Sequence, residues 1–107
     1  MSVKDINKDQ FQKEVIENKG IVLVDFYADW CGPCQIMTPL IDELSEEMKD
    51  VSFVKVNVDE NGSLASEYSV SSIPSFYIFK DGKVVSQFLG VKSKEDITNE
   101  INKVNKD

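Results

Sequence analysis

The sequence contains no histidine and no arginine. Without an imidazole, the chain cannot build Cys–His or Ser–His–Asp nucleophile pairs, nor the metal sites that depend on histidine. Its 12 basic residues are all lysine and face 19 acidic ones, so the formal net charge is −7. The chain therefore lacks the guanidinium fork that reads phosphate or guanine, and its charge repels nucleic acids and anionic membrane surfaces. We expect neither nucleic acid nor a membrane as a partner.

Long apolar runs are also missing. No segment approaches the roughly 20 apolar residues of a membrane-spanning helix, and residues 1–15 contain no apolar stretch typical of a secretory signal peptide. We therefore expect a cytoplasmic protein, in a compartment where thiols stay reduced. The length of 107 residues, with 41% hydrophobic and 29% charged residues, predicts one folded domain over 1–107. We expect this domain to be a monomer.

Apolar periodicity and turn residues predict that strands and helices alternate along the chain. Strands are expected at 3–6, 21–28 and 51–58 and, as a hairpin about Asp81-Gly82, within 75–90. Helices are expected after an Asn7 capping box, after the cysteines, within 61–68 and at the C-terminus. Helical crossovers make the first strands parallel and the hairpin makes the last ones antiparallel. The expected fold is α/β, with a mixed sheet and helices on both faces.

The only cysteines, Cys31 and Cys34, are separated by Gly32 and Pro33. In a helix, positions i and i+3 share a face with Cβ atoms about 5–6 Å apart, and disulfides need Cα separations of about 4.4–6.8 Å. The pair can therefore exist as two thiols or close into a disulfide with little backbone movement. It follows a strand and opens a helix, where open α/β sheets place their chemistry. Pro39 is expected to kink this helix without ending it.

The two cysteines are expected to differ in reactivity. The positive end of the helix dipole lowers the pKa of Cys31, which we expect to be the exposed thiol, whereas Cys34 lies one turn further in and is expected to be buried. Pro33 suits the first helical turn and stiffens the gap between the sulfurs, and neither it nor Gly32 adds a cation. The pattern therefore predicts a dithiol switch with a redox-active disulfide.

Two other interpretations of the cysteine pair are a zinc half-site and a structural disulfide. Zinc takes about four Cys or His ligands, and this chain has two cysteines and no histidine. A structural bridge across so short a loop would constrain the unfolded chain little. The redox interpretation is therefore favoured, with no metal and no bound cofactor.

The segments VDFYADWCGPC, KVNVDEN, SIPSFYIFKDGK and FLG, together with Pro39, resemble the thioredoxin family over essentially the whole chain. The resemblance implies the thioredoxin fold, a three-layer α/β/α sandwich around a mixed sheet of about five strands. It also implies a thiol–disulfide oxidoreductase: a protein-disulfide reductase and dithiol electron carrier in cell redox homeostasis. Its partners would be disulfide-containing substrate proteins and a thioredoxin-reductase-type enzyme that recycles it.

Two charged residues occur inside strands that are expected to be buried. Asp25 lies in IVLVDFYA, where burial raises the pKa of a carboxyl group; the alternative is an aspartate exposed at the strand end. The resemblance implies that Asp25 is the base that deprotonates Cys34. Lys55 lies in FVKVNV, where it can tune the proton affinity of Asp25 if the two strands are neighbours. Alternatively, the aliphatic part of the Lys55 side chain packs on the protein while its ammonium group reaches water.

The resemblance also implies a substrate-binding surface. Pro74 would have a cis peptide bond and lie against the sulfurs, so that the Ile73 backbone could pair with an extended substrate; from the residues alone, a proline before a strand is unremarkable. An apolar docking surface is expected from Trp30, Ile73, Val58, Gly90 and Val91. For Val58 and Val91 the alternative is ordinary packing.

The chain departs from the family pattern at Tyr27, where many relatives carry a second tryptophan, and at Ser71-Ser72 before Ile73-Pro74. The absence of a cation between the cysteines favours a reductant. The alternatives are a disulfide oxidase or isomerase of the same fold, and a non-catalytic subunit that binds a partner through the surface around Trp30.

Overall fold

The computed structural model describes residues 3–105, in which helices separate the strands except at a hairpin formed by the last two strands. The sequence of elements agrees with the predicted order, and the bounds are β1 (Val3–Asp5), α1 (Lys8–Phe11), η1 (Gln12–Ile16), β2 (Ile21–Tyr27), α2 (Gly32–Glu47), β3 (Val51–Asn57), α3 (Gly62–Glu67), β4 (Ser75–Lys80), β5 (Lys83–Leu89) and α4 (Lys94–Asn105).

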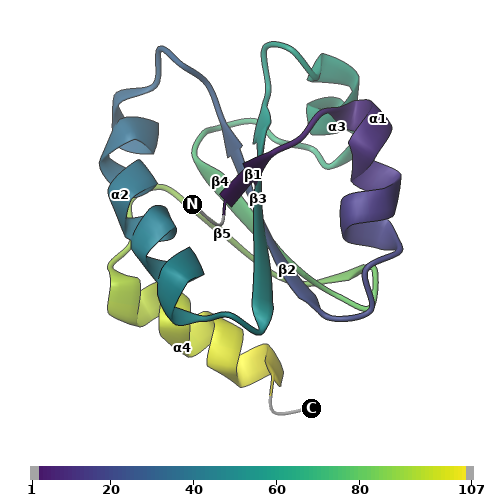
Figure 1. Ribbon diagram of the computed structural model, residues 1–107. Helices are drawn as coiled ribbons and strands as arrows, with labels where there is room; N and C mark the ends of the chain where they lie inside the picture. The colour runs from purple at the N-terminus through teal and green to yellow at the C-terminus, as the bar shows by residue number, and fades with distance from the viewer. Residues whose placement is uncertain (1–2, 106–107) are drawn as a thin grey trace.

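The five strands form one mixed sheet in the order β1-β3-β2-β4-β5. Strands β1 and β2 both run parallel to β3, whereas β4 is antiparallel to β2 and to β5. Helices α2 and α4 cover one face of the sheet and α1 and α3 cover the other, as Figure 1 shows. The expected three-layer arrangement around a mixed sheet is confirmed.

Strand β2 is buried on both faces because helices lie on both sides of it. Val22, Val24 and Phe26 point into the core beneath α1 and α3. Ile21 and Leu23 point the other way, into the core beneath α2 and α4. Since side chains alternate along a strand, the next residue on this second face is Asp25. The sheet therefore carries a carboxyl group directly towards α2.

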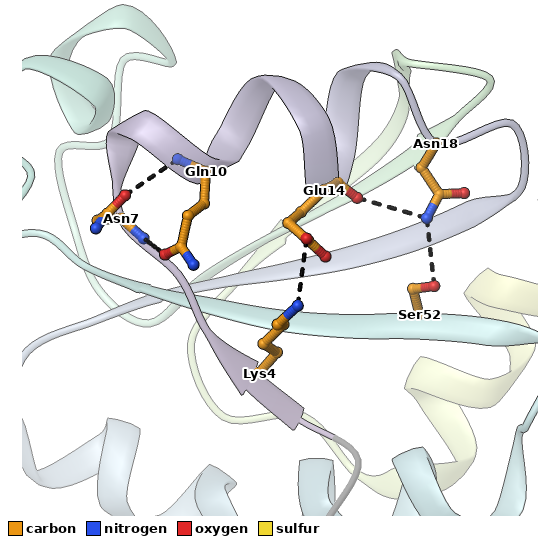
Figure 2. A network of polar contacts seen from close by, with 6 residues as sticks. All are labelled: Lys4, Asn7, Gln10, Glu14, Asn18 and Ser52. Carbon is orange, nitrogen blue, oxygen red and sulfur yellow. Dashed lines mark hydrogen bonds and ion pairs between the residues drawn. The ribbon is translucent and has the colours of Figure 1, made fainter.

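The predicted Asn7 capping box is present at the start of α1 (Figure 2). The Asn7 carboxamide oxygen accepts the Gln10 amide hydrogen at 3.0 Å, and the Gln10 side chain accepts that of Asn7 at 3.0 Å. The helix then changes to a π-helical turn, η1, which the sequence did not predict. In Figure 2 the same segment is joined to β1 by the Lys4–Glu14 ion pair, 3.2 Å long.

Several predicted boundaries were one residue too long. Strands β1, β2 and β3 each end one residue before the predicted position. The residue after β3, Val58, still donates its amide hydrogen to the Tyr27 carbonyl at 2.8 Å, but the chain turns there. Helix α2 continues through Pro39 without a break, as expected. In the described residues, no helix combines the length and apolar character needed to cross a membrane.

Candidate active site

A disulfide joins Cys31 and Cys34 at the N-terminus of α2, just beyond the carboxyl end of β2. Cys31 is the N-cap residue, with an extended backbone, and its sulfur accepts the Cys34 amide hydrogen at 3.1 Å. The Cα atoms are 5.3 Å apart, within the range that the spacing predicted. The pair is therefore held where the helix N-terminus stabilises negative charge on the Cys31 sulfur.

Both cysteines are buried in this disulfide form. Cys31 is 3% exposed and Cys34 is 4% exposed, so the expectation of an exposed Cys31 is wrong for the oxidised chain. Both cysteines belong to a small apolar cluster with Ala28, and Val58 and Ile73 pack against this cluster. Val58 and Ile73 come from distant parts of the sequence, so the cysteine motif alone could not indicate them.

Asp25 lies on the face of β2 that is covered by α2 and α4, and it is 6% exposed. The alternative of an aspartate exposed at a strand end is thus excluded. Burial raises the pKa of the Asp25 carboxyl group from 3.8 to about 7, and the positive charge of Lys55 opposes part of this rise. Among the described residues, Asp25 Oδ1 has no hydrogen-bond partner. A group with such a pKa can exchange protons at neutral pH.

A pocket of ≈ 220 Å³ brings Asp25 and Cys34 together beneath the first turns of α2. Its walls come from β2, β3, α2 and the loop before the cysteines, and its lining residues are Asp25, Tyr27, Ala28, Asp29, Cys34, Gln35, Thr38 and Lys55. The pocket connects the candidate base with the inner cysteine and is large enough to hold a water molecule. Proton transfer between the two groups is therefore geometrically possible.

Lys55 stands directly opposite Asp25 in the parallel pairing of β2 with β3. The sequence-based condition for contact, that the two strands are neighbours, is therefore met. The Lys55 ammonium lies over the ring of Tyr27, 5.1 Å from its centroid. This position keeps the charge beside Tyr27, which lines the pocket, while Lys55 as a whole is half-buried.

The peptide bond between Ile73 and Pro74 is cis, as the resemblance implied. Pro74 is buried, and its carbonyl accepts the Gly90 amide hydrogen at 2.9 Å. Ile73 packs against the apolar cluster that contains the two cysteines. The loop before β4 therefore lies next to the disulfide, and Gly90 joins it from the end of β5.

Part of the predicted docking surface forms a second pocket of ≈ 340 Å³, lined by Trp30, Val58, Val70, Ser71, Ser72 and Ile73. Trp30 is 71% exposed, and its indole nitrogen donates to Asp59 at 2.7 Å. Gly90 and Val91 do not line this pocket. The sequence did not predict that Val70, Ser71 and Ser72 line this pocket. The available indication was that they precede Ile73 directly in the sequence.

The donor set for a metal is limited. Over residues 3–105, no three Cys, Asp or Glu side chains gather in an arrangement that could hold a metal ion. The two sulfurs are bonded to each other, and the pocket beside Cys34 offers two carboxyl groups, those of Asp25 and Asp29. The chemistry that this arrangement supports is reversible dithiol–disulfide exchange with an adjacent proton acceptor.

Comparison with known proteins gives the same result. Residues 2–103 match the family model described as thioredoxin. A thioredoxin of Chlamydia pneumoniae is 46% identical over 101 residues, covering 94% of this chain and 97% of its own length. Thioredoxin 1 of Synechococcus elongatus is 47% identical over 94 residues, covering 87% and 88%. A thioredoxin of Rickettsia felis is 44% identical, covering 92% and 94%. The chain therefore belongs to the thioredoxin family, and it is a thiol–disulfide oxidoreductase whose cysteine pair reduces disulfides.

Proposed function

We propose that the chain reduces disulfides of other proteins with Cys31 as the attacking thiolate, Cys34 as the resolving thiol and Asp25 as its base. The observation that carries this assignment is the geometry at the start of α2. Cys31 caps the helix, while Cys34 lines the pocket that also contains Asp25. The two sulfurs thus have different neighbours although both are buried.

In the first step, the Cys31 thiolate attacks one sulfur of the substrate disulfide. A bond forms between Cys31 and that sulfur, the substrate S–S bond breaks, and the second substrate sulfur leaves as a thiolate. The Cys34 amide hydrogen, which points at the Cys31 sulfur, stabilises the attacking thiolate together with the helix N-terminus. The product is a mixed disulfide.

In the second step, the Asp25 carboxylate accepts the proton of the Cys34 thiol, directly or through a water molecule in the pocket. The Cys34 thiolate attacks the Cys31 sulfur, and the substrate leaves as its second thiolate. The Cys31–Cys34 disulfide closes, so two electrons have passed to the substrate. Lys55 tunes Asp25, and Gly32 and Pro33 tune the cysteines by leaving the turn between them without a cation.

The substrate is proposed to dock on the apolar surface beside the disulfide. Trp30, Val58 and Ile73 share a pocket there. The backbone of Ile73 precedes the cis bond, and it is proposed to pair with an extended segment of the substrate. Gly90 and Val91 extend this surface beyond Pro74, since Gly90 is hydrogen-bonded to it.

The need for a recycling partner follows from the same chemistry. The oxidised chain needs a reductant, so a thioredoxin-reductase-type enzyme is proposed to return it to the dithiol form, which makes the chain an electron carrier. We propose that it acts as a cytoplasmic monomer. The family favours reduction over the alternative of a disulfide oxidase or isomerase.

The test is reduction of insulin disulfides by the dithiol form, compared with the background of the small thiol that regenerates it. Turnover well above that background is expected, and turnover equal to it contradicts the proposal. Cys31→Ser is expected to abolish turnover. A Cys31→Ser/Cys34→Ser variant that kept the protein's biological activity would instead favour the non-catalytic, partner-binding role.

A further inference from the structure

Three charged residues form one row across the sheet at the level of the candidate base. Asp5 of β1 is paired in register with Lys55 of β3, and Lys55 is paired with Asp25 of β2. Register partners on adjacent strands point to the same face and lie about 5 Å apart. Lys55 therefore stands between two aspartates in this row, the buried Asp25 and the exposed Asp5 of the edge strand.

Tyr27 contacts two of these three residues, Asp5 and Lys55. Its hydroxyl group donates to Asp5 Oδ2 at 2.8 Å. Its ring lies beneath the Lys55 ammonium, with Nζ 5.1 Å from the centroid, close enough for a cation–π interaction. Tyr27 also lines the pocket that contains Asp25. The Tyr27 side chain thus hydrogen-bonds to Asp5, the aspartate that could otherwise attract Lys55, and its ring holds the Lys55 ammonium beside the pocket.

We propose that Tyr27 is a positioning residue, which holds the Lys55 ammonium beside Asp25 through its ring and its hydrogen bond to Asp5. This rests on the proposed function, because it concerns the proton affinity of the base in the second step. The tyrosine hydroxyl keeps its proton, since burial, and then the contact with Asp5, raise the pKa of Tyr27 above its ordinary value. The bond to Asp5 therefore persists across the working pH range.

The direction of the effect follows from charge. A cation near a carboxyl group favours the carboxylate, so weakening the contribution of Lys55 raises the pKa of Asp25. Without the tyrosine hydroxyl, Asp5 regains a free acceptor and draws the ammonium away from the pocket. The ionisable and polar groups around Asp25 are, from each packed element, Lys55 of β3, Tyr27 of β2, Cys34, Gln35 and Thr38 of α2, and Asp29 of the intervening loop. Strand β4 presents Phe76, which carries no charge.

The experiment follows the carboxyl carbon of Asp25 by NMR during a pH titration of the oxidised protein, in which neither cysteine titrates. Tyr27→Phe keeps the ring and removes the hydroxyl group, and it is expected to raise the titration midpoint by about 0.5 to 1 pH unit. Tyr27→Leu, which also removes the ring, is expected to raise it at least as far. A wild-type midpoint in either variant overturns the proposal.

A matched control is available on the other face of the sheet. Tyr77 also donates its hydroxyl hydrogen, to the Tyr68 carbonyl, but it belongs to the core beneath α1 and α3. Tyr77→Phe removes the same chemical group and is expected to leave the Asp25 midpoint unchanged. An equal shift in Tyr77→Phe would mean that general loosening of the core, and not positioning, moves the midpoint.

A double-variant comparison tests the route through Lys55. Lys55→Gln is expected to raise the Asp25 midpoint, and adding Tyr27→Phe is expected to cause no further rise. If the full Tyr27→Phe shift persists without the lysine, the proposal is wrong. Failure of the proposed function is visible separately: Asp25→Asn would then leave the rate of mixed-disulfide resolution unchanged, whatever the titrations show.

Discussion

Asp25 and Lys55 lie directly opposite each other on neighbouring parallel strands, and the pocket that they line also contains Cys34. The buried carboxyl group has its pKa raised to about 7, mainly by loss of hydration. An ordinary aspartate would be a carboxylate at every physiological pH and too weak a base for a thiol. This relationship between a buried acid and a nearby cation leads to two predictions.

The first concerns the pH dependence of the resolving step. Asp25→Asn is expected to slow release of substrate from the mixed disulfide, by up to about 100-fold at pH 8, because the base is lost. In the wild type this rate rises with pH through about 7, as the carboxylate form becomes populated. In the variant this rise is absent. Stopped-flow fluorescence of Trp30, the only tryptophan, measures both rates; an unchanged pH profile in the variant would contradict the base assignment.

The second prediction concerns stability. The folded-state pKa of Asp25 lies above the unfolded value of 3.8, so the folded chain binds the proton more tightly and loses stability as pH rises from about 4 to about 7. Asp25→Asn removes this loss and is expected to stabilise the protein by up to about 4 kcal/mol above pH 7, with little effect near pH 3. Denaturant unfolding at both pH values measures it.

A matched control for this prediction is the exposed Asp50, which follows α2. Asp50→Asn is expected to change the free energy of unfolding by less than about 0.5 kcal/mol at either pH. If Asp25→Asn stabilises the chain equally at low and high pH, the carboxyl charge is not the cause.

Much of the fold could be predicted from the sequence because β2 and β3 are nearly continuous apolar runs and because turn residues separate the elements. The charged residues inside those runs, Asp25 and Lys55, were identifiable as exceptions to burial. Their contact depended only on the strands being neighbours, which sequential strands often are. These features are local or depend on one pairing.

Other features could not be predicted because they depend on register and on distant segments. The hydrogen bond from Tyr27 to Asp5 requires the pairing of β1 with β3 as well as that of β3 with β2. Burial of Cys31 depends on Val58 and Ile73, which approach only in the folded chain. The π-helical turn after Phe11 leaves an ordinary amphipathic pattern in the sequence.

A third prediction concerns the β4–β5 turn. Asp81 and Gly82 both have positive φ, 52° and 81°, as a two-residue hairpin turn of type I′ requires. A Cβ atom at Gly82 would also clash with the Ile16 carbonyl. Gly82→Ala is therefore expected to destabilise the protein by clearly more than the roughly 1–2 kcal/mol that a left-handed conformation costs alone, as measured by denaturant unfolding.

Gly90 provides the comparison for this clash. Its φ is 79°, nearly that of Gly82, but a Cβ atom there would meet nothing within 4 Å. Gly90→Ala is expected to cost only the conformational part, about 1–2 kcal/mol. Equal losses at the two glycines would show that the approach of Ile16 contributes nothing.

A fourth prediction concerns substrate docking. Val58→Thr exchanges a methyl group in the Trp30 pocket for a hydroxyl group of similar size. It is expected to raise KM for insulin by roughly 3- to 10-fold through lost apolar contact, with kcat unchanged. The rate with a small disulfide, which does not span the pocket, is expected to stay the same. Val85→Thr, an equivalent change at an exposed position on β5, is the control. If Val85→Thr raised KM for insulin as much as Val58→Thr, a docking role for Val58 would be contradicted.

The central claim is that Cys31 attacks the substrate and Cys34 resolves the intermediate. The most direct measurement is mass spectrometry of Cys34→Ser and Cys31→Ser after reaction with a disulfide-containing protein. Cys34→Ser is expected to accumulate a mixed disulfide at Cys31, released by a small thiol, whereas Cys31→Ser is expected to accumulate none. Trapping through Cys34 in the Cys31→Ser chain, or no adduct in the Cys34→Ser chain, would contradict it.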